Sequence, residues 1–538
     1  MASEASAIAG RPPGGIPPGI EATEPILEKF REFGPNYRWL ATLTTLLGSF
    51  ATLLTATIIN VAIPDIMGSL GMTESQAQWL ATGFLATTTV TMLIAAWAVE
   101  CFGIARTFVV AMLIFAAGSV AGGLAPTGET LIAARVIQGA GAGLMTPLAM
   151  LIVYQVFPVH RRGTAMGIYA VGIILAPALG PAFGGALVDQ FSWRYVFFMA
   201  IPFVMASLPM AILFLPERDP QARRPDFDWT GVVLLSVFLV CLLIALSNGP
   251  GYGWGSPEVA WLAFGTVLSG IAFLYWEWYV KDPLMNLRLF LNARFLAAAV
   301  VTFVLGAGLF GSTYVLPLFL QSVQGLTPSD SGLMLVPAGL LMAVVFPIAG
   351  RLSDELAPRN LILTGLTIFA LSTLLFRHVD ANTPYATLIL WVALGRIGLA
   401  LIFPCLNAAA LRPLPLHLLA QGSGAINFLR QLGGAFGVNL ITIYLIHRTD
   451  VHAHELVLTQ TAGNAQTILM TDLYMPRLYM TLGLSERMSE LVSMGALQNM
   501  VIQQGSMLAY RDTFVAIAVV FLLCLIPAWF MDKRRPNQ

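Results

Sequence analysis

Charge is what this sequence has least of. Only 10% of its 538 residues are Asp, Glu, Lys or Arg, whereas soluble proteins carry roughly 25%. Apolar residues make up 57% of the chain, and the mean hydropathy is +0.77. A bilayer is crossed by helices of about 20 mostly apolar residues. The composition therefore predicts an all-α polytopic membrane protein.

Lysine and cysteine are also scarce. None of the three lysines follows a glycine in the phosphate-binding pattern GxxxxGK[ST], and neither HExxH nor GxSxG occurs. We therefore expect no enzyme, no cofactor and no nucleotide-driven pump. The four cysteines have neither disulfide nor metal spacing. We expect them to be small core residues.

Carboxylates are missing from the middle of every predicted span. The acids nearest to a span centre are Glu100, Glu258, Glu277 and Asp330, and all of them fall near span ends. No acid is therefore an obvious proton carrier within the membrane.

The apolar runs predict fourteen spans. Their approximate limits are 38–63, 76–98, 107–125, 129–157, 164–187, 194–216, 230–248, 259–280, 296–320, 328–350, 361–377, 385–411, 421–446 and 512–532. With both termini inside, the tails and inner connections hold 19 Lys and Arg, the outer side six and the spans three. This bias places both termini in the cytoplasm.

A weak internal repeat divides the chain. LGPAFGG at 179–185 resembles LGGAFGV at 432–438, and Glu100 and Asp354 precede these runs by similar distances. Two six-helix halves related in this way are typical of transporters. We expect a partly disordered cytoplasmic tail at 1–37, bundles at 38–216 and 296–532, two inserted spans at 230–280 and a second tail at 533–538. Thr23 to Phe33 could form a surface helix.

The run from Gly163 to Val188 is the most unusual span. Four of its glycines remove side chains from the helix surface, so that a neighbour can approach closely, and its prolines remove backbone donors and bend the helix. These residues are Gly172, Pro177, Gly180, Pro181, Gly184 and Gly185. We predict a kinked helix that slides against the partner half, and we expect Gly180→Leu to abolish transport without removing the protein from the membrane.

Three arginines lie within spans. An arginine at mid-span costs about 2.5–3.5 kcal/mol on insertion scales, so Arg135, Arg396 and Arg430 should face protein or water. Each arginine either stabilises the helix bundle through hydrogen bonds or contacts a proton or substrate during transport. For Arg135 the role in transport is favoured. The amides with the same two readings are Asn60, Gln138, Asn427 and Gln431.

Several short motifs resemble a known family when taken in order. Arg135-Val136-Ile137-Gln138-Gly139 resembles RxxQG, Thr57 to Pro64 resembles the span 1 signature, and Gly163 to Val188 resembles the span 5 antiporter motif. Asn427 to Gly434 also fits. The chain is similar over nearly its whole length to fourteen-span major facilitator drug:proton antiporters of the EmrB/QacA type.

The chain departs from that family at two places. The loop after span 2 keeps Glu100, Gly103 and Arg106 but loses neighbouring bases; Asp354 and Arg359 mark the corresponding loop of the second half. Many relatives carry an aspartate where this chain has Thr55. The role of that acid in proton coupling cannot be transferred to this chain.

The resemblance implies proton-driven efflux of small hydrophobic or amphipathic compounds by alternating access. The partners would be protons, membrane lipid, a small-molecule substrate and, in a tripartite system of the bacterial inner membrane, a periplasmic adaptor and an outer-membrane channel; no nucleic acid is expected. Three arginines without deep acids also suggest weak aromatic acids as cargo. The alternatives are a major facilitator importer and a non-transporting sensor or scaffold.

The periplasmic loop expected at 447–511 is the one sizeable soluble piece. Ser485 could cap a helix with an apolar face at Leu491, Met494, Leu497, Val501 and Leu508. That face either packs on its own protein or docks a partner. His447, His452 and His454 lack a carboxylate or cysteine framework, so we expect a solvated loop rather than a metal site.

Overall fold

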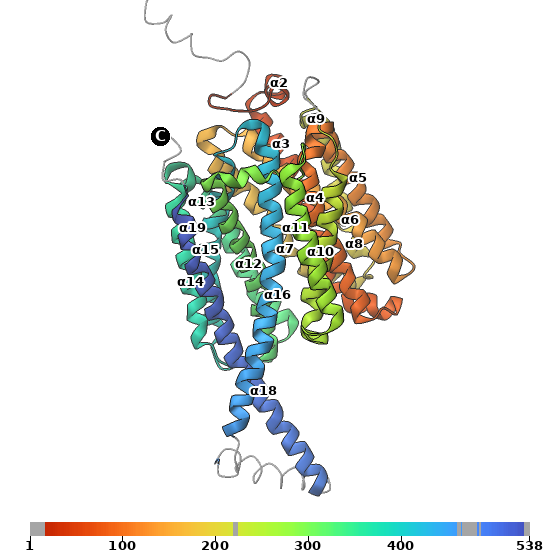
Figure 1. Ribbon diagram of the computed structural model, residues 1–538, viewed down its shortest axis with the longest axis vertical. Coiled ribbons are helices and arrows are strands. Elements are labelled where there is room, and N and C mark those ends of the chain that lie inside the picture. Colours follow the sequence, from red (N-terminus) through yellow and green to blue (C-terminus); the bar gives the residue numbers. More distant parts are fainter. Residues whose placement is uncertain are drawn as a thin grey trace, which may run out of the picture.

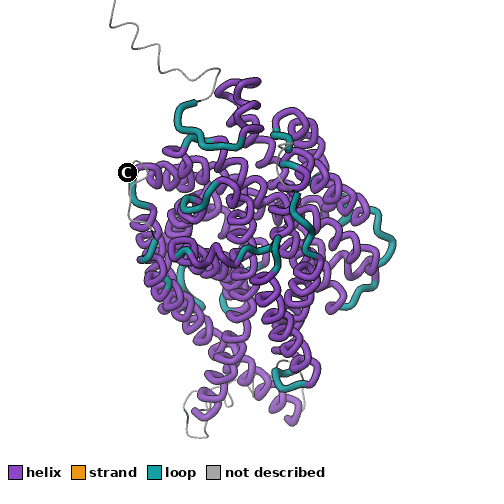
Figure 2. The backbone as a smooth tube through the Cα atoms, turned by 45° about the horizontal axis from the view of Figure 1, so that its top comes forward, coloured by secondary structure: helices purple, strands orange, loops and turns teal. Residues whose placement is uncertain are grey.

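The computed structural model describes residues 17–218, 224–459 and 486–531, together with 464, 481 and 483. Within these residues the secondary structure is helical and contains no strand (Figure 2). The long helices run side by side in one bundle (Figure 1). The described ends of the chain lie at the same end of that bundle, here called the termini end, and a pair of long helices projects from the opposite end, the extension end (Figure 1).

The helices form three consecutive groups. The N-terminal group contains α3 (Tyr37–Leu70), α4 (Glu74–Phe102), α5 (Ile104–Gly123), α6 (Gly128–Val156), α7 (Arg162–Gln190), α8 (Tyr195–Phe198) and α9 (Ile201–Phe214). The inserted pair is α10 (Trp229–Tyr252) and α11 (Pro257–Tyr279). The C-terminal group contains α12 (Ala293–Ser322), α13 (Pro328–Glu355), α14 (Pro358–Leu375), α15 (Tyr385–Leu411), α16 (Leu419–Thr459), α18 (Glu486–Leu523) and α19 (Leu525–Trp529).

The expected number of membrane spans agrees closely with the structure. Thirteen helices of the described chain are long and apolar enough to cross a membrane. These do not include α7, part of whose side chains lie outside the description, but its 29 residues are ample for a crossing. With α7 the number reaches the fourteen expected.

The packing follows the internal repeat. Gly180 of α7 lies against Thr57 of α3, and Gly433 of α16 lies against the Phe303 carbonyl of α12. The fifth helix of each group thus packs on the first helix of the same group. Between the groups, α7 packs on α13 and α15, and α16 packs on α4 and α6. The inserted α10 contacts both α4 and α16, so it lies beside this second seam.

Two segments differ from the sequence prediction. The span expected at 194–216 is divided into α8 and α9. The loop expected to begin at 447 is helical as far as Thr459, and α18 is already helical at Glu486, well before the predicted span at 512. Residues 447–459 contain neither glycine nor proline. The hydropathy falls there, but nothing stops the helix.

The expected surface helix near the N-terminus is present as α2 (Glu24–Phe33). Its Ile26 and Phe30 are fully buried. The Lys29 ammonium donates to the Leu213 carbonyl at 3.0 Å, and Arg162 pairs with Glu21 at 3.5 Å. The segment therefore packs on the N-terminal group at the termini end. Residues 1–16 and 532–538, which include part of the first expected tail and all of the second, lie outside the described residues.

Candidate functional site

The two groups are latched together at the termini end by one carboxylate. Asp354, near the end of α13, accepts hydrogen bonds from the Gly163 amide at 2.7 Å and the Thr164 amide at 2.9 Å. The Thr164 hydroxyl donates to the same carboxylate. These donors belong to the first turn of α7, whose free amides and positive dipole favour an anion. An acid expected only to mark a loop therefore joins the two groups.

Glycines allow the backbones of α7 and α13 to touch beside this latch. A Cβ on Gly163 would lie 2.6 Å from the Gly350 carbonyl, and one on Gly167 would lie 2.5 Å from the Phe346 carbonyl. Both distances are shorter than real Cβ atoms show. Any larger residue at these two positions would force the groups apart.

The motif glycines of α7 contact a different helix from the one expected. Gly172 lies against Leu46, Gly180 against Thr57 and Gly184 against Ile58, all on α3. The closest neighbour of a Cβ on Gly185 would be Val61, at 4.0 Å. The prediction that these glycines meet the partner half is wrong, because α3 covers this face and Gly163 and Gly167 make the contact between groups. The side chains of Pro177 and Pro181 lie outside the description.

Arg135 is fully buried and held within the N-terminal group. Its Nε donates to the Leu80 carbonyl at 2.9 Å, and Nη1 donates to the Gln138 amide oxygen at 2.6 Å. Gln138 in turn donates to Ser119 at 2.7 Å, and the guanidinium lies 4.1 Å from the Phe84 ring centroid. These contacts join α4, α5 and α6. They are the contacts expected of an arginine that stabilises the bundle, whereas the sequence favoured a contact with a proton or substrate.

Arg430 lies in a polar cluster between the groups. Its Nη2 donates to Asn427, and Nη1 lies 3.5 Å from the Asn407 amide oxygen. Across the seam, the Asn427 amide donates to the Met150 sulfur at 3.2 Å, and Tyr169 of α7, whose buried hydroxyl donates to the Thr146 carbonyl at 3.1 Å, lies near Arg430. This arginine therefore belongs to a polar cluster that connects the two groups. Asn407 and Tyr169 did not stand out in the sequence as its partners, because sequence spacing does not relate distant helices.

Arg396 lies inside the C-terminal group. Its Nη2 donates to Thr313 of α12 at 3.1 Å. The residue also lines a cavity of about 40 Å³ among α12, α14, α15 and α18. A space of that size suits a water molecule rather than an organic substrate.

A larger cavity lies at the seam between α4 and α16. Its volume is about 240 Å³, and α10 and α12 complete its wall. The residues that line it are Gln78, Thr82, Leu85, Leu243, Ser247, Phe310, Gln431, Gly434, Ala435, Val438 and Asn439. The lining holds hydrogen-bonding groups and apolar surface but no charged side chain. Of the predicted site residues, only Gln431 lines this cavity.

The cavity lies toward the extension end. α3 begins at the termini end, so α4 begins at the other end, and Gln78 is close to that beginning. Ser247 correspondingly lies near the end of α10, where the Gln78 amide donates to its hydroxyl. Sequence reasoning missed Gln78, Ser247 and Asn439. They come from three helices whose adjacency depends on where the inserted pair sits.

The remaining predicted residues are spread over the molecule. Thr55 is buried and its hydroxyl donates to the Ala51 carbonyl of its own helix at 3.0 Å. Asn60 is exposed on α3. These two residues are therefore not drawn into the Arg430 cluster.

The residues of the termini-end loops have separate contacts. The Glu100 carbonyl accepts from Arg218 at 3.1 Å, and a Cβ on Gly103 would lie 2.5 Å from the Arg218 amide. Arg106 is exposed. Arg359 is buried, and its guanidinium lies 3.6 Å from a ring centroid of Trp529. Among these residues, Asp354 bridges the two groups through side-chain hydrogen bonds to α7.

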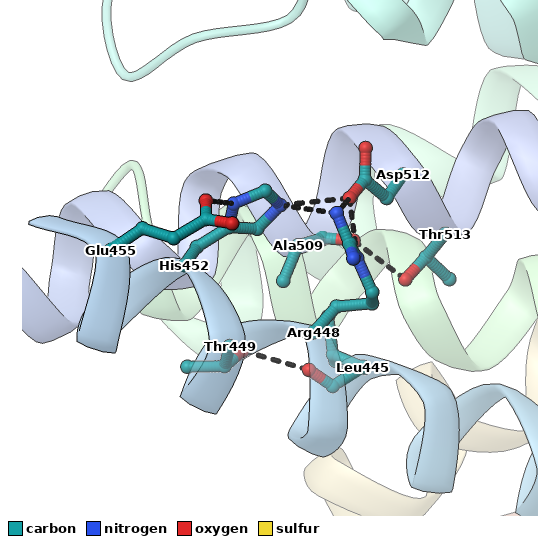
Figure 3. Close-up of polar contacts among 8 residues, drawn as sticks. All are labelled: Leu445, Arg448, Thr449, His452, Glu455, Ala509, Asp512 and Thr513. Carbon is teal, nitrogen blue, oxygen red and sulfur yellow. Dashed lines mark hydrogen bonds and ion pairs between the residues drawn. The ribbon is translucent and has the colours of Figure 1, made fainter.

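The long helices of the extension are joined by charges at their base. Asp512 of α18 accepts from Arg448 Nε at 2.7 Å and lies 2.8 Å from His452 Nε2, and His452 Nδ1 lies 3.3 Å from Glu455 (Figure 3). His452 thus lies on α16 and belongs to a polar network around the Arg448–Asp512 ion pair rather than to a solvated loop. Across the described chain, no group of three or more His, Cys, Asp or Glu is arranged to hold a metal.

The predicted apolar face of α18 has two parts. Val501 is buried and Leu508 is half-buried, whereas Met494 is 58% exposed. Leu497 is half-buried, and Ser485 and the side chain of Leu491 lie outside the description. The part near the bundle packs on its own protein, and the part farther out offers exposed apolar side chains.

Comparison with known proteins gives the family. The family model "Major Facilitator Superfamily" matches residues 45–438. Multidrug export protein EmrB of Haemophilus influenzae is 30% identical over 91% of this chain and 95% of its own length. Lincomycin resistance protein LmrB of Bacillus subtilis is 29% identical over 77% of this chain and 86% of its own length.

Solved structures agree on the fold. The human organic anion transporter MFSD10 matches 92% of this chain and 99% of its own with a TM-score of 0.58 at 15% identity. The proton:xylose symporter XylE matches 90% of this chain and 95% of its own with a TM-score of 0.53 at 14% identity. The chain therefore belongs to the major facilitator superfamily, as an EmrB-like drug transporter of that fold.

Proposed function

We propose that this protein exports small hydrophobic or amphipathic compounds across a bacterial inner membrane by alternating access, driven by proton entry. The observation that carries the proposal is the pairing of a latched termini end with an uncharged cavity toward the extension end. With the termini in the cytoplasm, this arrangement corresponds to the state that releases substrate outward. The names of EmrB and LmrB support drugs as the substrate class.

The seam cavity favours uncharged or weakly charged amphipathic substrates. Gln78, Gln431 and Asn439 offer donors and acceptors, and Leu85, Leu243 and Phe310 offer apolar surface. The three membrane arginines do not line this cavity. Weak aromatic acids are a second substrate class, for which the Arg430 cluster at the same seam is the recognition site.

Efflux from cells tests the proposal. Bacteria that lack their own multidrug pumps should accumulate less of an uncharged lipophilic dye when they express this protein. Gln431→Leu removes hydrogen-bonding groups from the cavity, so accumulation should return toward that of cells without the protein. The matched control is Gln503→Leu on the exposed surface of α18. Equal dye accumulation with and without the protein contradicts efflux.

We also propose that the extension docks a periplasmic adaptor, which would connect the protein to an outer-membrane channel. Its exposed apolar side chains support this proposal: Val457 is 58% exposed, Leu458 79% and Met494 58%. Leu458→Glu combined with Met494→Glu should weaken capture of the adaptor while efflux across the inner membrane alone is retained. Unchanged capture would mean that the extension serves the transporter itself.

A further inference from the structure

Two buried carboxyl groups face each other at the termini end of the inserted pair. Asp228 precedes the first turn of α10 and Glu277 lies near the end of α11; they are 6% and 2% exposed. A Cβ on Gly231 would lie 2.3 Å from Asp228 Oδ2 and 2.6 Å from Glu277 Oε1. The two oxygens are therefore no farther apart than the sum of these distances.

The other oxygen of each carboxyl already has its donors. Asp228 Oδ1 accepts from the Gly231 amide and from Trp276 Nε1, both at 2.8 Å. Glu277 Oε2 accepts from the Met285 amide at 3.1 Å. Among the described residues, Asp228 Oδ2 and Glu277 Oε1 have no hydrogen-bond donor. One hydrogen placed between these two oxygens would therefore give both of them a hydrogen-bond partner.

We propose that Asp228 and Glu277 share one proton and form a proton-binding site in the inserted pair. Two ionised carboxylates at this separation repel strongly away from water, whereas one shared proton leaves a single charge and supplies the missing hydrogen bond. A metal ion fits poorly, because Ca²⁺ takes six to eight oxygen ligands and Mg²⁺ completes its six with several waters, whereas two oxygens are free here and both residues are buried away from water.

The charged side chains that the structure describes on neighbouring elements do not supply a hydrogen bond to the two facing oxygens of the pair. They are Arg224 and Asp226 before α10, Lys281 and Asp282 after α11, and Glu100 and Arg218 beside the end of α4. The Asp226 amide donates to Asp282 at 3.2 Å, and Arg218 donates to the Glu100 carbonyl. No cation among the described residues donates to either facing oxygen.

The site is coupled to the seam between the two groups. Trp97 of α4 donates to the Pro225 carbonyl at 3.1 Å and packs on Phe227 with ring centroids 4.4 Å apart. The segment that ends at Asp228 is thereby fixed to α4, and α10 also contacts α16. When the proton leaves to water, only an O–H bond breaks. The second negative charge then drives the start of α10 away from the end of α11.

Infrared spectroscopy of the purified full-length protein tests proton binding directly. At neutral pH the wild type should show the carbonyl band of a protonated carboxyl group. Glu277→Gln and Asp228→Asn each supply an amide donor to the remaining carboxylate, so each should lose that band. The matched control is Glu258→Gln, an exposed acid at the other end of α11, which should keep it.

Each other outcome overturns the proposal. A wild type without the band holds no shared proton, and a band that survives both amide variants belongs to another group. A band that is also lost in Glu258→Gln does not report on the Asp228–Glu277 pair, and this result too overturns the proposal. Because each amide variant preserves the shape of the pair, either one alone suffices if the other fails to accumulate. Proton binding goes beyond the proposed efflux, and the spectrum is read without any transport.

Discussion

At the residue scale, buried polar groups differ in whether they bond within one group of helices or between the two groups. Arg135 has its partners on helices of one group, whereas Arg430 bonds to Asn427, whose amide donates across the seam to Met150. The same residue type therefore bonds within one group in one place and lies at the contact between the groups in another. Asp354 belongs to the second kind, because its donors all lie in the opposite group.

Arg135→Met should destabilise the protein. The substitution keeps the approximate length of the side chain but leaves the Gln138 amide oxygen without its donor, at a cost of about 1–3 kcal/mol. We expect a lower midpoint of thermal unfolding in detergent, whereas the exposed Arg106→Met should unfold like the wild type. If the variant unfolds like the wild type but no longer transports, Arg135 acts on the substrate or the proton rather than on stability.

Asp354→Ala should loosen the latch. The carboxylate accepts three hydrogen bonds from the start of α7, and bonds to a charged group contribute about 1.5–3 kcal/mol each. Amide hydrogen exchange should therefore become faster in the first turns of α7. The neighbouring exposed Glu355→Ala should leave exchange there unchanged. Equal protection in wild type and Asp354→Ala would show that the latch does not hold the groups together.

At the element scale, glycines of α7 allow two kinds of close helix contact, one within its own group and one with the other group. Gly172, Gly180 and Gly184 let α7 pack on α3 within one group, and Gly163 and Gly167 let it reach α13 in the other. Gly180→Leu would therefore collide with Thr57 and disturb folding of the N-terminal group as well as transport. The expectation that this variant loses transport alone does not fit that contact.

Gly167→Ala should favour the state in which the termini end is open. The added Cβ would lie 2.5 Å from the Phe346 carbonyl, and backbone cannot move aside as a flexible side chain does. Spin labels on α7 and α13 at the termini end should report a longer distance than in the wild type. Gly185→Ala, whose Cβ has only Val61 at 4.0 Å, is the control. Identical distances in all three proteins would disprove the effect.

The helices were predictable from the sequence because length and hydropathy define a membrane span. Their partners were not, since the packing face of Gly180 depends on how α3 and α13 flank α7. Hydropathy also failed at 447, where α16 leaves the apolar region without a helix breaker. In the sequence Glu277 is only an acid near a span end, and Asp228 lies just before the span predicted at 230–248. Their pairing follows only from the antiparallel register of α10 and α11.

At the scale of the whole molecule, the extension and the inserted pair distinguish this chain from two plain six-helix groups. The extension consists of helices continuous with membrane spans, so its movements are linked to those of the C-terminal group. The inserted α10 contacts helices of both groups. Both additions are therefore attached to the groups that the proposed alternating access would move.

Asp512→Asn should separate the two arms of the extension. Asp512 pairs with Arg448 and His452 at the base of the arms, and the amide cannot replace that charge (Figure 3). Spin labels at the exposed positions Leu458 and Met494 should show a broader distance distribution than in the labelled wild type. The exposed Asp450→Asn is the control. An unchanged distribution would mean that apolar packing alone holds the arms.

Proton exchange for substrate is the central claim, and purified protein in sealed vesicles tests it most directly. The vesicles enclose a pH-sensitive dye, and a pH gradient is imposed before an uncharged amphipathic substrate is added. The account predicts that the substrate accelerates proton flux, and that reversing the gradient reverses the direction in which substrate moves. Substrate transport that is indifferent to the gradient, or proton flux that is indifferent to substrate, would contradict it.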